Sequence, residues 1–376
     1  MDLQAIRSEM PVSARWIYLN HAAVAPLSRP AARAMRRLVR DAEENGMVNY
    51  DDWNQLYTRA RRSVAALIGS HADEIAFLKN TTDGLLAVAN GIHWRRGDNL
   101  VLARGEFPAN VDPWLNLRDR GVEVRWVPEQ AGRLRVEDFA AAIDGSTRAI
   151  AVSSVEFLSG FRNDLARLGQ LCREHGLLFV VDAIQSLGVF PLDVGALGID
   201  CLAADGHKWL LGPEGCALFY CSRRALKQLH VAALGWAGVS TAYDFLNYDT
   251  TLYPDARRFE TGTQNTAGIA GLKAGVDFLL EVGIPAIGDR VLELTDHLCA
   301  GLEQKGYQLL SSRARNEASG IVSFRSPRHR SEDLYQGLRA GGVVSSLRCG
   351  YLRLSPHFYN TVDELERALH LLPSAT

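Results

Sequence analysis

Short apolar runs alternate with segments of helical periodicity through the first two-thirds of the chain. The strand-like runs cover residues 74–78, 99–103, 122–127, 149–155, 177–181 and 199–204, with a further run at 216–221. The helical segments cover about 31–44, 53–68, 110–119, 136–143 and 163–175, and another ends near 93. Because strands that alternate with helices form parallel sheets covered on both faces, the pattern predicts an α/β fold with a mainly parallel sheet. The run at 216–221 is expected to be an antiparallel strand at the edge of this sheet.

The last third of the chain has a different organisation. A long helical pattern at 268–282 is broken by Gly283, Ile284 and Pro285, and strand-like runs at 321–324 and 351–355 and a helical pattern at 362–372 follow. The break predicts a smaller α+β domain. We therefore divide the chain into an N-terminal segment (1–30) that packs with the small domain, a large domain (31–267), and a linking helix with the small domain (268–376).

Composition limits the classes of function. The chain of 376 residues has a net charge of −2 and no basic stripe, so neither a nucleic-acid nor a membrane partner is expected. The six cysteines are scattered without a C-x-x-C pair, which predicts reduced, buried thiols in a cytoplasmic protein. The ten histidines show no metal-ligand spacing, so no metal site is predicted.

Two strand ends carry complementary side chains. Asp182 follows the apolar run 177–181, and Lys208 follows the run 199–204. Because ligands of open α/β sheets bind outside the carboxyl ends of the strands, the acid and the amine are expected to face one crevice. An amine that holds an aldehyde as a Schiff base, with an acid that keeps a pyridine nitrogen protonated, suits pyridoxal phosphate. A buried structural aspartate and a surface lysine are the alternative.

Three other segments offer binding groups. Asn80 to Gly84 stands where a helix begins and can cradle a phosphate, or can hold an ordinary threonine N-cap. Phe107, after a strand, can stack on a flat ring or simply pack. Arg348 and Arg353 can bind carboxylates or form surface ion pairs.

Taken together and in this order, the motifs V-D-A-I-Q-S, D-G-H-K-W and R-F-E-T-G-T resemble the class V aminotransferase family of fold-type I pyridoxal phosphate enzymes. That family includes cysteine desulfurases, selenocysteine lyases and isopenicillin N epimerase-like proteins. The resemblance covers nearly the whole chain. It implies a large domain with a mainly parallel seven-stranded sheet and a homodimer with shared active sites.

The resemblance also implies roles for individual residues. Lys208 would form the Schiff base, Asp182 would pair with the pyridine nitrogen, and both are therefore the expected catalytic residues. The other residues expected to bind the cofactor are Thr81, Thr82 and His207 at the phosphate, Gln185 at the ring hydroxyl, Phe107 on the ring, and Gly262 and Thr263 reaching the phosphate of the neighbouring subunit. Arg348 would bind the substrate α-carboxylate, with Asn20 and Ala22 on the substrate side, whereas Arg353 is expected to serve structure.

Two positions depart from the family pattern. Asp205 stands where many members have a phosphate-binding serine, and a carboxylate beside a phosphate is repulsive, so Asp205 is not assigned to the phosphate. Desulfurases carry a catalytic cysteine on a loop after the segment that matches Arg348. Here Cys349 runs almost directly into the strand-like Tyr351 to Ser355, which leaves no room for such a loop.

These observations leave the reaction partly open. The freed Lys208 would act as a general base at the α-carbon of an amino-acid substrate. Transamination, elimination and epimerisation all follow from the resulting carbanion. The absence of the desulfurase loop favours an aminotransferase-like enzyme. A C–S lyase or cysteine desulfurase-like activity and an epimerase are the alternatives, and an inactive binding protein of the same fold is a further one.

Overall fold

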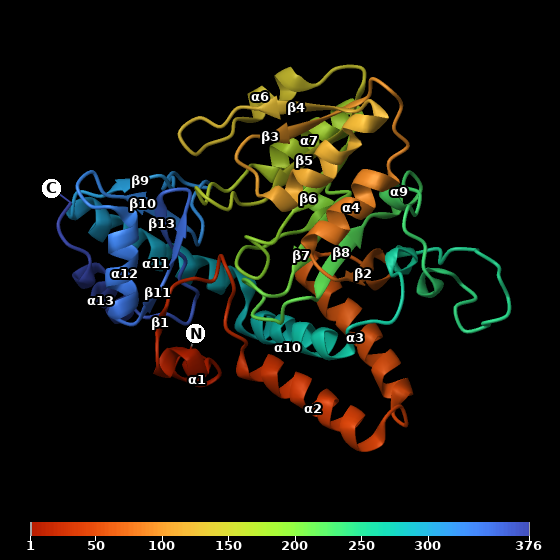
Figure 1. Ribbon diagram of the computed structural model, residues 1–376, viewed down its shortest axis with the longest axis horizontal. Coiled ribbons are helices and arrows are strands. Elements are labelled where there is room, and N and C mark those ends of the chain that lie inside the picture. The colour runs from red at the N-terminus through yellow and green to blue at the C-terminus, as the bar shows by residue number, and fades with distance from the viewer. Residues whose placement is uncertain (1, 376) are drawn as a thin grey trace.

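A seven-stranded sheet forms the centre of the larger part of the molecule in the computed structural model, which describes residues 2–375 (Figure 1). The strand order is β2-β8-β7-β6-β5-β3-β4. The strands are Ile75–Leu78 (β2), Asn99–Ala103 (β3), Glu123–Val127 (β4), Thr147–Ser153 (β5), Leu178–Asp182 (β6), Cys201–Asp205 (β7) and Ala217–Cys221 (β8). Strand β8 is antiparallel to both neighbours, and the other pairs are parallel. The predicted α/β fold with a mainly parallel seven-stranded sheet is confirmed.

The position predicted for β8 is wrong, although its direction is right. It lies between β2 and β7, and β2 and β4 occupy the edges. All five residues of β8 are buried, which suits an interior strand. The sequence run shows this burial but not that β2, far earlier in the chain, pairs with β8 on its outer side.

Helices cover both faces of the sheet. The longer helices of this part are Arg29–Asn45 (α2), Tyr50–Ile68 (α3), Thr81–Gly91 (α4), Leu165–His175 (α7) and Thr266–Val282 (α10). Shorter ones are Val136–Ala142 (α6), Val194–Leu197 (α8) and Arg223–Leu226 (α9), with 3-10 turns at Ala72–Glu74, Trp236–Gly238 and Ala256–Phe259. Successive strand side chains point to opposite faces, so Phe179 and Val181 of β6 join the core that includes α3 and α10, whereas Leu178 and Val180 join the core under α4.

The single helix predicted at 110–119 is wrong. That segment forms three short pieces: the 3-10 turns Pro108–Asn110 and Asn116–Arg120, and Asp112–Leu115 (α5) between them. Pro108 and Pro113 lack the N–H that a continuous helix would need, so each stands at the start of a piece. Gly121, in the left-handed region, ends the last piece.

The break predicted after residue 282 is confirmed. Gly283 (φ 93°) ends α10, and Ile284–Gln304 (α11) begins at once with Pro285 in its first turn. The remaining elements are Gln308–Leu309 (β9), Val322–Arg325 (β10), Ser331–Ala340 (α12), Val343–Val344 (β11), Ser346–Arg348 (β12), Tyr351–Leu354 (β13) and Val362–Leu371 (α13). The order β12-β13-β10-β9 forms a four-stranded antiparallel sheet. Helices α11 and α12 were not predicted.

The N-terminal segment lies beside this second sheet (Figure 1). It consists of Leu3–Ser8 (α1), the 3-10 turn Pro11–Ala14 and Ile17–Tyr18 (β1), which pairs in parallel with β11. Asn20 forms a further bridge with Ser355, and Ile17 and Leu19 join the same apolar core as α11 and α13. The exact domain boundaries at 30 and 267 remain a prediction. Within the described residues, no helix is long and apolar enough to cross a membrane.

Candidate functional site

A pocket of about 250 Å³ opens at the carboxyl ends of β2, β3, β6 and β7. It is lined by Ala22, Ala23, Val24, Asn80, Thr81, Thr82, Phe107, Ala109, Phe157, Asp182, Ile184, Gln185, Asp205, His207, Lys208, Arg348 and Arg353. The structure therefore brings together nine of the residues that the sequence singled out for the site: Ala22, Thr81, Thr82, Phe107, Asp182, Gln185, His207, Lys208 and Arg348. Their individual roles remain predictions.

Lys208 stands in a tight turn directly after β7. The turn is fixed by two backbone hydrogen bonds, from Gly212 N to Gly206 O (2.9 Å) and from Leu211 N to Lys208 O (3.1 Å). The side chain is only 8% exposed, and its Nζ lies 5.5 Å from the centroid of the Phe107 ring. Among residues 2–375 the amine has no hydrogen-bond partner. Burial lowers the pKa of Lys208 to about 8, although Asp182 acts in the opposite direction.

Asp182 ends β6 and is also buried. Its Oδ1 accepts a hydrogen bond from Ile184 N at 3.0 Å. Burial raises the pKa of Asp182 to about 6, while that hydrogen bond and the charge of Lys208 oppose the rise. A buried carboxylate that lines the same pocket as a buried amine is the arrangement that the sequence predicted for these two residues.

The start of α4 forms another wall of the pocket. Asn80, and not Thr81 or Thr82, is the N-cap, because its side chain accepts from Asp83 N at 2.9 Å. The first backbone N–H groups of a helix have no partner within it, so those of Thr81 and Thr82 remain for an anion. The Thr81 hydroxyl accepts a hydrogen bond from Asp205 N (3.0 Å), which ties this helix end to the end of β7.

Asp205 turns one oxygen toward His207. The distance from Asp205 Oδ2 to His207 Nδ1 is 3.1 Å, which is an ion-pair distance without the geometry of a hydrogen bond. Asp205 Oδ1 and His207 Nδ1 are buried polar atoms that lack a hydrogen-bond partner within the described chain. The free helix N–H groups and the unpartnered His207 Nδ1 fit the phosphate end of pyridoxal phosphate, whereas the Asp205 carboxylate would repel a phosphate placed against it.

Gln185 is already used at both ends of its amide. Its Nε2 donates to Ala22 O at 3.0 Å, and its Oε1 accepts from Trp209 Nε1 at 2.9 Å. One amide N–H is left for a ligand. Asn20 does not line the pocket, and its buried Oδ1 has no partner among residues 2–375.

The two arginines differ in burial. Arg348 is exposed, and its Nη1 donates to the backbone oxygen of Leu347 at 3.0 Å. Arg353 is 1% exposed and donates to Phe157 O from Nη1 (2.6 Å) and to Ser346 Oγ from Nε (3.3 Å). No carboxylate of residues 2–375 forms an ion pair with either guanidinium. Burial and the nearby Arg348 lower the pKa of Arg353 to about 10.

Arg353 is a pocket residue that sequence reasoning assigned to structure. Burial of a cation without an acid partner costs free energy, so such a group is expected to bind an anionic ligand. The signal in the sequence is an arginine at an inward position of a strand, between Leu352 and Leu354. That signal does not show which face of the strand is turned toward the pocket.

Gly262 and Thr263 do not reach this pocket in the single chain. They line a different hollow of about 610 Å³, together with Lys79, Asp83 and Arg120. The prediction that they complete the phosphate site of a neighbouring subunit is therefore not tested by the position of these residues.

Cys349 lies at the tip of the hairpin that joins β12 and β13. Only Cys349 and Gly350 separate the two strands, and both have positive φ (48° and 81°). A two-residue turn with positive φ at both positions is the tightest common hairpin connection. The predicted absence of a desulfurase-like loop is confirmed. Cys349 is exposed, whereas the other five cysteines are free and buried, so the prediction of buried thiols is wrong for this one residue.

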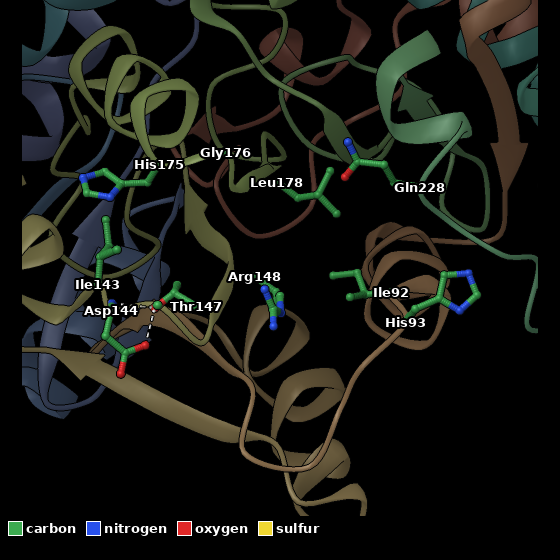
Figure 2. A pocket seen from close by; sticks show the side chains of 11 residues that line it. Ile92, His93, Ile143, Asp144, Thr147, Arg148, His175, Gly176, Leu178 and Gln228 are labelled. Carbon is green, nitrogen blue, oxygen red and sulfur yellow. Dashed lines mark hydrogen bonds between the residues drawn. The ribbon is translucent and has the colours of Figure 1, made fainter.

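A larger hollow of about 640 Å³ lies at the opposite, amino ends of β5 and β6 (Figure 2). Its charged groups are already paired: Arg148 with Asp98 at 2.7 Å, and Asp144 with Arg125 at 2.5 Å. Asp144 N also donates to the Thr147 hydroxyl at 2.9 Å (Figure 2). These satisfied groups give a ligand little to bind, so the smaller pocket around Lys208 is the better candidate site.

Comparison with known proteins shows the family to which the chain belongs. Residues 17–367 match the family described as aminotransferase class-V. That family depends on pyridoxal phosphate, so the predicted cofactor is confirmed.

Individual relatives cover nearly the whole chain. A probable cysteine desulfurase of Methanothermobacter thermautotrophicus is 32% identical, over 97% of this chain and 96% of its own length. An uncharacterized aminotransferase of Bacillus subtilis is 28% identical, over 95% of each chain. The structure of a cysteine desulfurase from Thermococcus onnurineus is similar with a TM-score of 0.88 and 25% identity, over 98% of this chain and 96% of that one.

Proposed function

Because this chain belongs to the aminotransferase class-V family, we propose that it is a pyridoxal-phosphate-dependent C–S lyase that acts on cysteine or a close derivative of it. The observation that carries the proposal is the likeness, at 32% identity over nearly the full length of both chains, to a probable cysteine desulfurase. The aminotransferase activity that the sequence pattern favoured has weaker support than this alternative.

The destination of the sulfur follows from the position of Cys349. A desulfurase needs a cysteine of its own that can enter the site and receive the sulfur. Cys349 does not line the pocket, and its two-residue turn leaves no flexible length on either side. We therefore propose that the sulfur leaves on a small molecule and not on a thiol of the protein.

The proposed reaction is a β-elimination. The Cα–H bond breaks as a base takes the proton, and the Cβ–S bond breaks as the sulfur leaves with the bonding pair as a thiolate. The remaining three-carbon fragment takes up water to give pyruvate and ammonia. No oxidant or reductant is required.

The residues of the pocket fit these steps. Pyridoxal phosphate, when bound, withdraws electrons from the substrate α-carbon. Lys208, whose pKa burial lowers to about 8, has a neutral fraction near pH 7 that can accept the α-proton. Asp182 would hold the pyridine proton. Arg353, a buried cation without an acid partner, would bind the substrate α-carboxylate, with Arg348 at the pocket mouth as a second cation.

The assembly expected from the sequence remains a proposal, in which Gly262 and Thr263 reach the partner's site. The surrounding surface supports an interface there. The loop between residues 234 and 248 exposes six large apolar side chains, Leu234, Trp236, Tyr243, Phe245, Leu246 and Tyr248. This loop projects from the body of the chain (Figure 1), and Trp236 lies against Gly262. The cytoplasmic location also remains a prediction.

A product assay tests the reaction. The purified holoenzyme would be incubated with cysteine, cystine and alanine, and sulfide, pyruvate and ammonia would be measured. Equal amounts of pyruvate and ammonia, with sulfide or a persulfide, are expected from the sulfur amino acids alone. Product that appears only when a keto acid is added would identify an aminotransferase, and a D-amino acid product would identify an epimerase.

A further inference from the structure

Two buried glutamates stand beside Asp182 and have no part in the proposed reaction. Glu106 follows β3, and Glu156 follows β5, so both lie at the same sheet edge as Asp182 at the end of β6. They are 7% and 2% exposed. Neither lines the pocket, so the reactants do not touch them.

Glu106 is bound to the residue next to Asp182 in the sheet. Ser153 of β5 is directly opposite Asp182 of β6. The backbone N–H of Ser153 donates to Glu106 Oε1 at 2.6 Å, and its hydroxyl donates to Oε2 at 2.5 Å. Glu106 is therefore hydrogen-bonded to the residue that pairs with Asp182, whose carboxyl group is predicted to hold the pyridine nitrogen.

Only one of the two carboxyl oxygens of Glu156 has a hydrogen-bond partner in the described chain. Its Oε1 accepts from Asn163 Nδ2 (2.7 Å), which also donates to Ser153 O (2.8 Å). Its Oε2 is buried and has no partner within residues 2–375. A charged carboxylate with a buried, unpaired oxygen is costly, so Glu156 keeps its proton. Burial first, and the neighbouring Glu106 second, raise the pKa of Glu156 well above its ordinary value.

The surrounding charged side chains do not neutralise the buried carboxyl groups of Glu106 and Glu156. Lys208 is the charged group that acts on Asp182. The carboxyl groups of Glu106, Glu129 and Asp182 act on Glu156. Arg353, Arg348 and Asp205 act on Lys208. No cation of the described chain forms an ion pair with Glu106 or Glu156. Burial, and to a smaller extent the charge of Asp182, raise the pKa of Glu106 to about 7, while the two Ser153 hydrogen bonds oppose the rise.

We propose that Glu106 is a positioning residue for the pyridine nitrogen: its carboxyl group, acting through Asp182, adds a second and titratable negative charge behind that nitrogen, while Glu156 remains neutral. At pH 6 Glu106 is mostly protonated, and Asp182, with a pKa of about 6, is itself only partly ionised. By pH 8 Glu106 is ionised as well, and its charge favours the protonated pyridine. The proposal concerns the cofactor and does not depend on the identity of the substrate.

The test measures cofactor affinity of the full-length apoprotein, without substrate. The dissociation constant of pyridoxal phosphate would be determined at pH 6 and pH 8 for the wild type and for Glu106→Gln, with the exposed Glu123→Gln as the control. We expect Glu106→Gln to bind about three- to tenfold more weakly than the wild type at pH 8 and equally at pH 6, since a shift of one pKa unit corresponds to a tenfold change. The phosphate and the pyridoxal group titrate alike in all three proteins. Their contributions therefore cancel in the ratio of the variant's dissociation constant to that of the wild type.

A second readout separates charge from packing. Glu106 has a raised folded-state pKa, so its favourable contribution to stability is present below the unfolded pKa of about 4.5 and is lost as pH rises through about 7. Glutamine stays neutral. The melting temperature of Glu106→Gln apoprotein relative to wild type should therefore be higher at pH 8 than at pH 5. The same difference at both pH values, or the same affinity ratio at both, would overturn the proposal and leave Glu106 a packing residue.

A milder variant guards against misfolding of Glu106→Gln. Ser153→Ala removes one hydrogen bond that favours charged Glu106, so the pH at which cofactor affinity rises should move upward. An unchanged midpoint in folded Ser153→Ala would also overturn the proposal.

Discussion

At the scale of single residues, the chemistry of the pocket depends on an amine that burial holds away from water. Lys208→Ala should keep the fold, lose the covalent link to the cofactor and lower turnover by at least roughly 10²–10⁴-fold, the usual contribution of a positioned proton acceptor. Borohydride reduction followed by mass spectrometry would detect the link, and circular dichroism the fold. Lys227→Ala, on the surface, is the matched control. Covalent cofactor retained in Lys208→Ala would refute the assignment.

The two arginines give a second prediction at this scale. Arg353→Ala should raise KM for cysteine by about ten- to hundredfold, because a lost hydrogen bond between charged groups costs about 1.5–3 kcal/mol. Arg348→Ala should have a smaller effect, since water can reach its exposed guanidinium. Cysteamine, which lacks the carboxylate, would serve as the comparison ligand in competition assays: its inhibition constant should change little in either variant. A larger effect of Arg348→Ala would favour the assignment made from the sequence.

The sequence predicted those site residues whose position follows from topology. Lys208 and Asp182 stand directly after apolar strands, and parallel strands bring their carboxyl ends to one edge. Topology gave no role to two other residues: Arg353 lies within a strand of the smaller sheet, and Glu106 follows β3 at the same edge as Lys208 but outside the pocket. Their significance lies in burial without a counter-ion, which depends on elements far away in the chain.

At the scale of elements, the hairpin between β12 and β13 fixes Cys349. Serine tolerates the same turn about as well as cysteine, so Cys349→Ser should change neither turnover nor melting temperature appreciably. Sulfide release and thermal unfolding would be measured. A large loss of sulfide release, with normal cofactor binding, would show that this thiol enters the site after all and would restore a desulfurase mechanism.

Element packing also predicts an acid-sensitive contact. His21 of the N-terminal segment and His357, which follows β13, are fully buried with rings 5.1 Å apart, and His357 Nε2 lies 3.1 Å from Trp209 O. Burial lowers the pKa of His357 to about 4, and that of His21 well below its ordinary value. Both are therefore neutral in the folded chain, while the unfolded chain binds protons below about pH 6.5.

The sign of this effect is a loss of stability on acidification. Between pH 6.5 and pH 4, His357 alone should reduce the free energy of unfolding by about 3 kcal/mol. Asp182 and Glu106, with raised pKa values, act in the opposite direction, so the comparison must be made with His357→Gln. Urea unfolding at pH 7 and pH 5 should show a smaller decrease for the variant. An equal decrease in both proteins would contradict the prediction.

Whether a segment forms a helix or a strand was easier to predict than which strands lie next to each other in the sheet. The period of apolar residues identified every strand of the large sheet, but the place of β8 depends on a partner that is distant in sequence. The segment 110–119 has helical periodicity, yet Pro113 divides it into short pieces. The local pattern of apolar residues therefore predicted the fold class. The order of the strands in the sheet and the division of the 110–119 segment into short pieces became visible only in the structure.

At the scale of the whole molecule, three distant parts of the chain meet at one pocket. Ala22 to Val24 come from the N-terminal segment, Asp182 and Lys208 from the large sheet, and Arg348 and Arg353 from the smaller sheet. The cofactor end of the pocket is thus built on one sheet and the substrate end on another. Relative movement of the two sheets would change the distance between the base and the carboxylate-binding group.

The assembly carries the last prediction. A two-fold dimer places the same loop at two equivalent sites, so Thr263 of each subunit would donate to the phosphate in the other. Loss of a hydrogen bond to a charged acceptor costs about 1.5–3 kcal/mol, so Thr263→Ala should weaken cofactor retention roughly ten- to hundredfold. Thr261→Ala, in the same hollow, is the matched control and should retain the cofactor. Chemistry at Lys208 should be normal in both variants at saturating cofactor, and sedimentation should show dimers. A monomer with full activity would refute the shared site, because no residue of that hollow lines the pocket of its own chain.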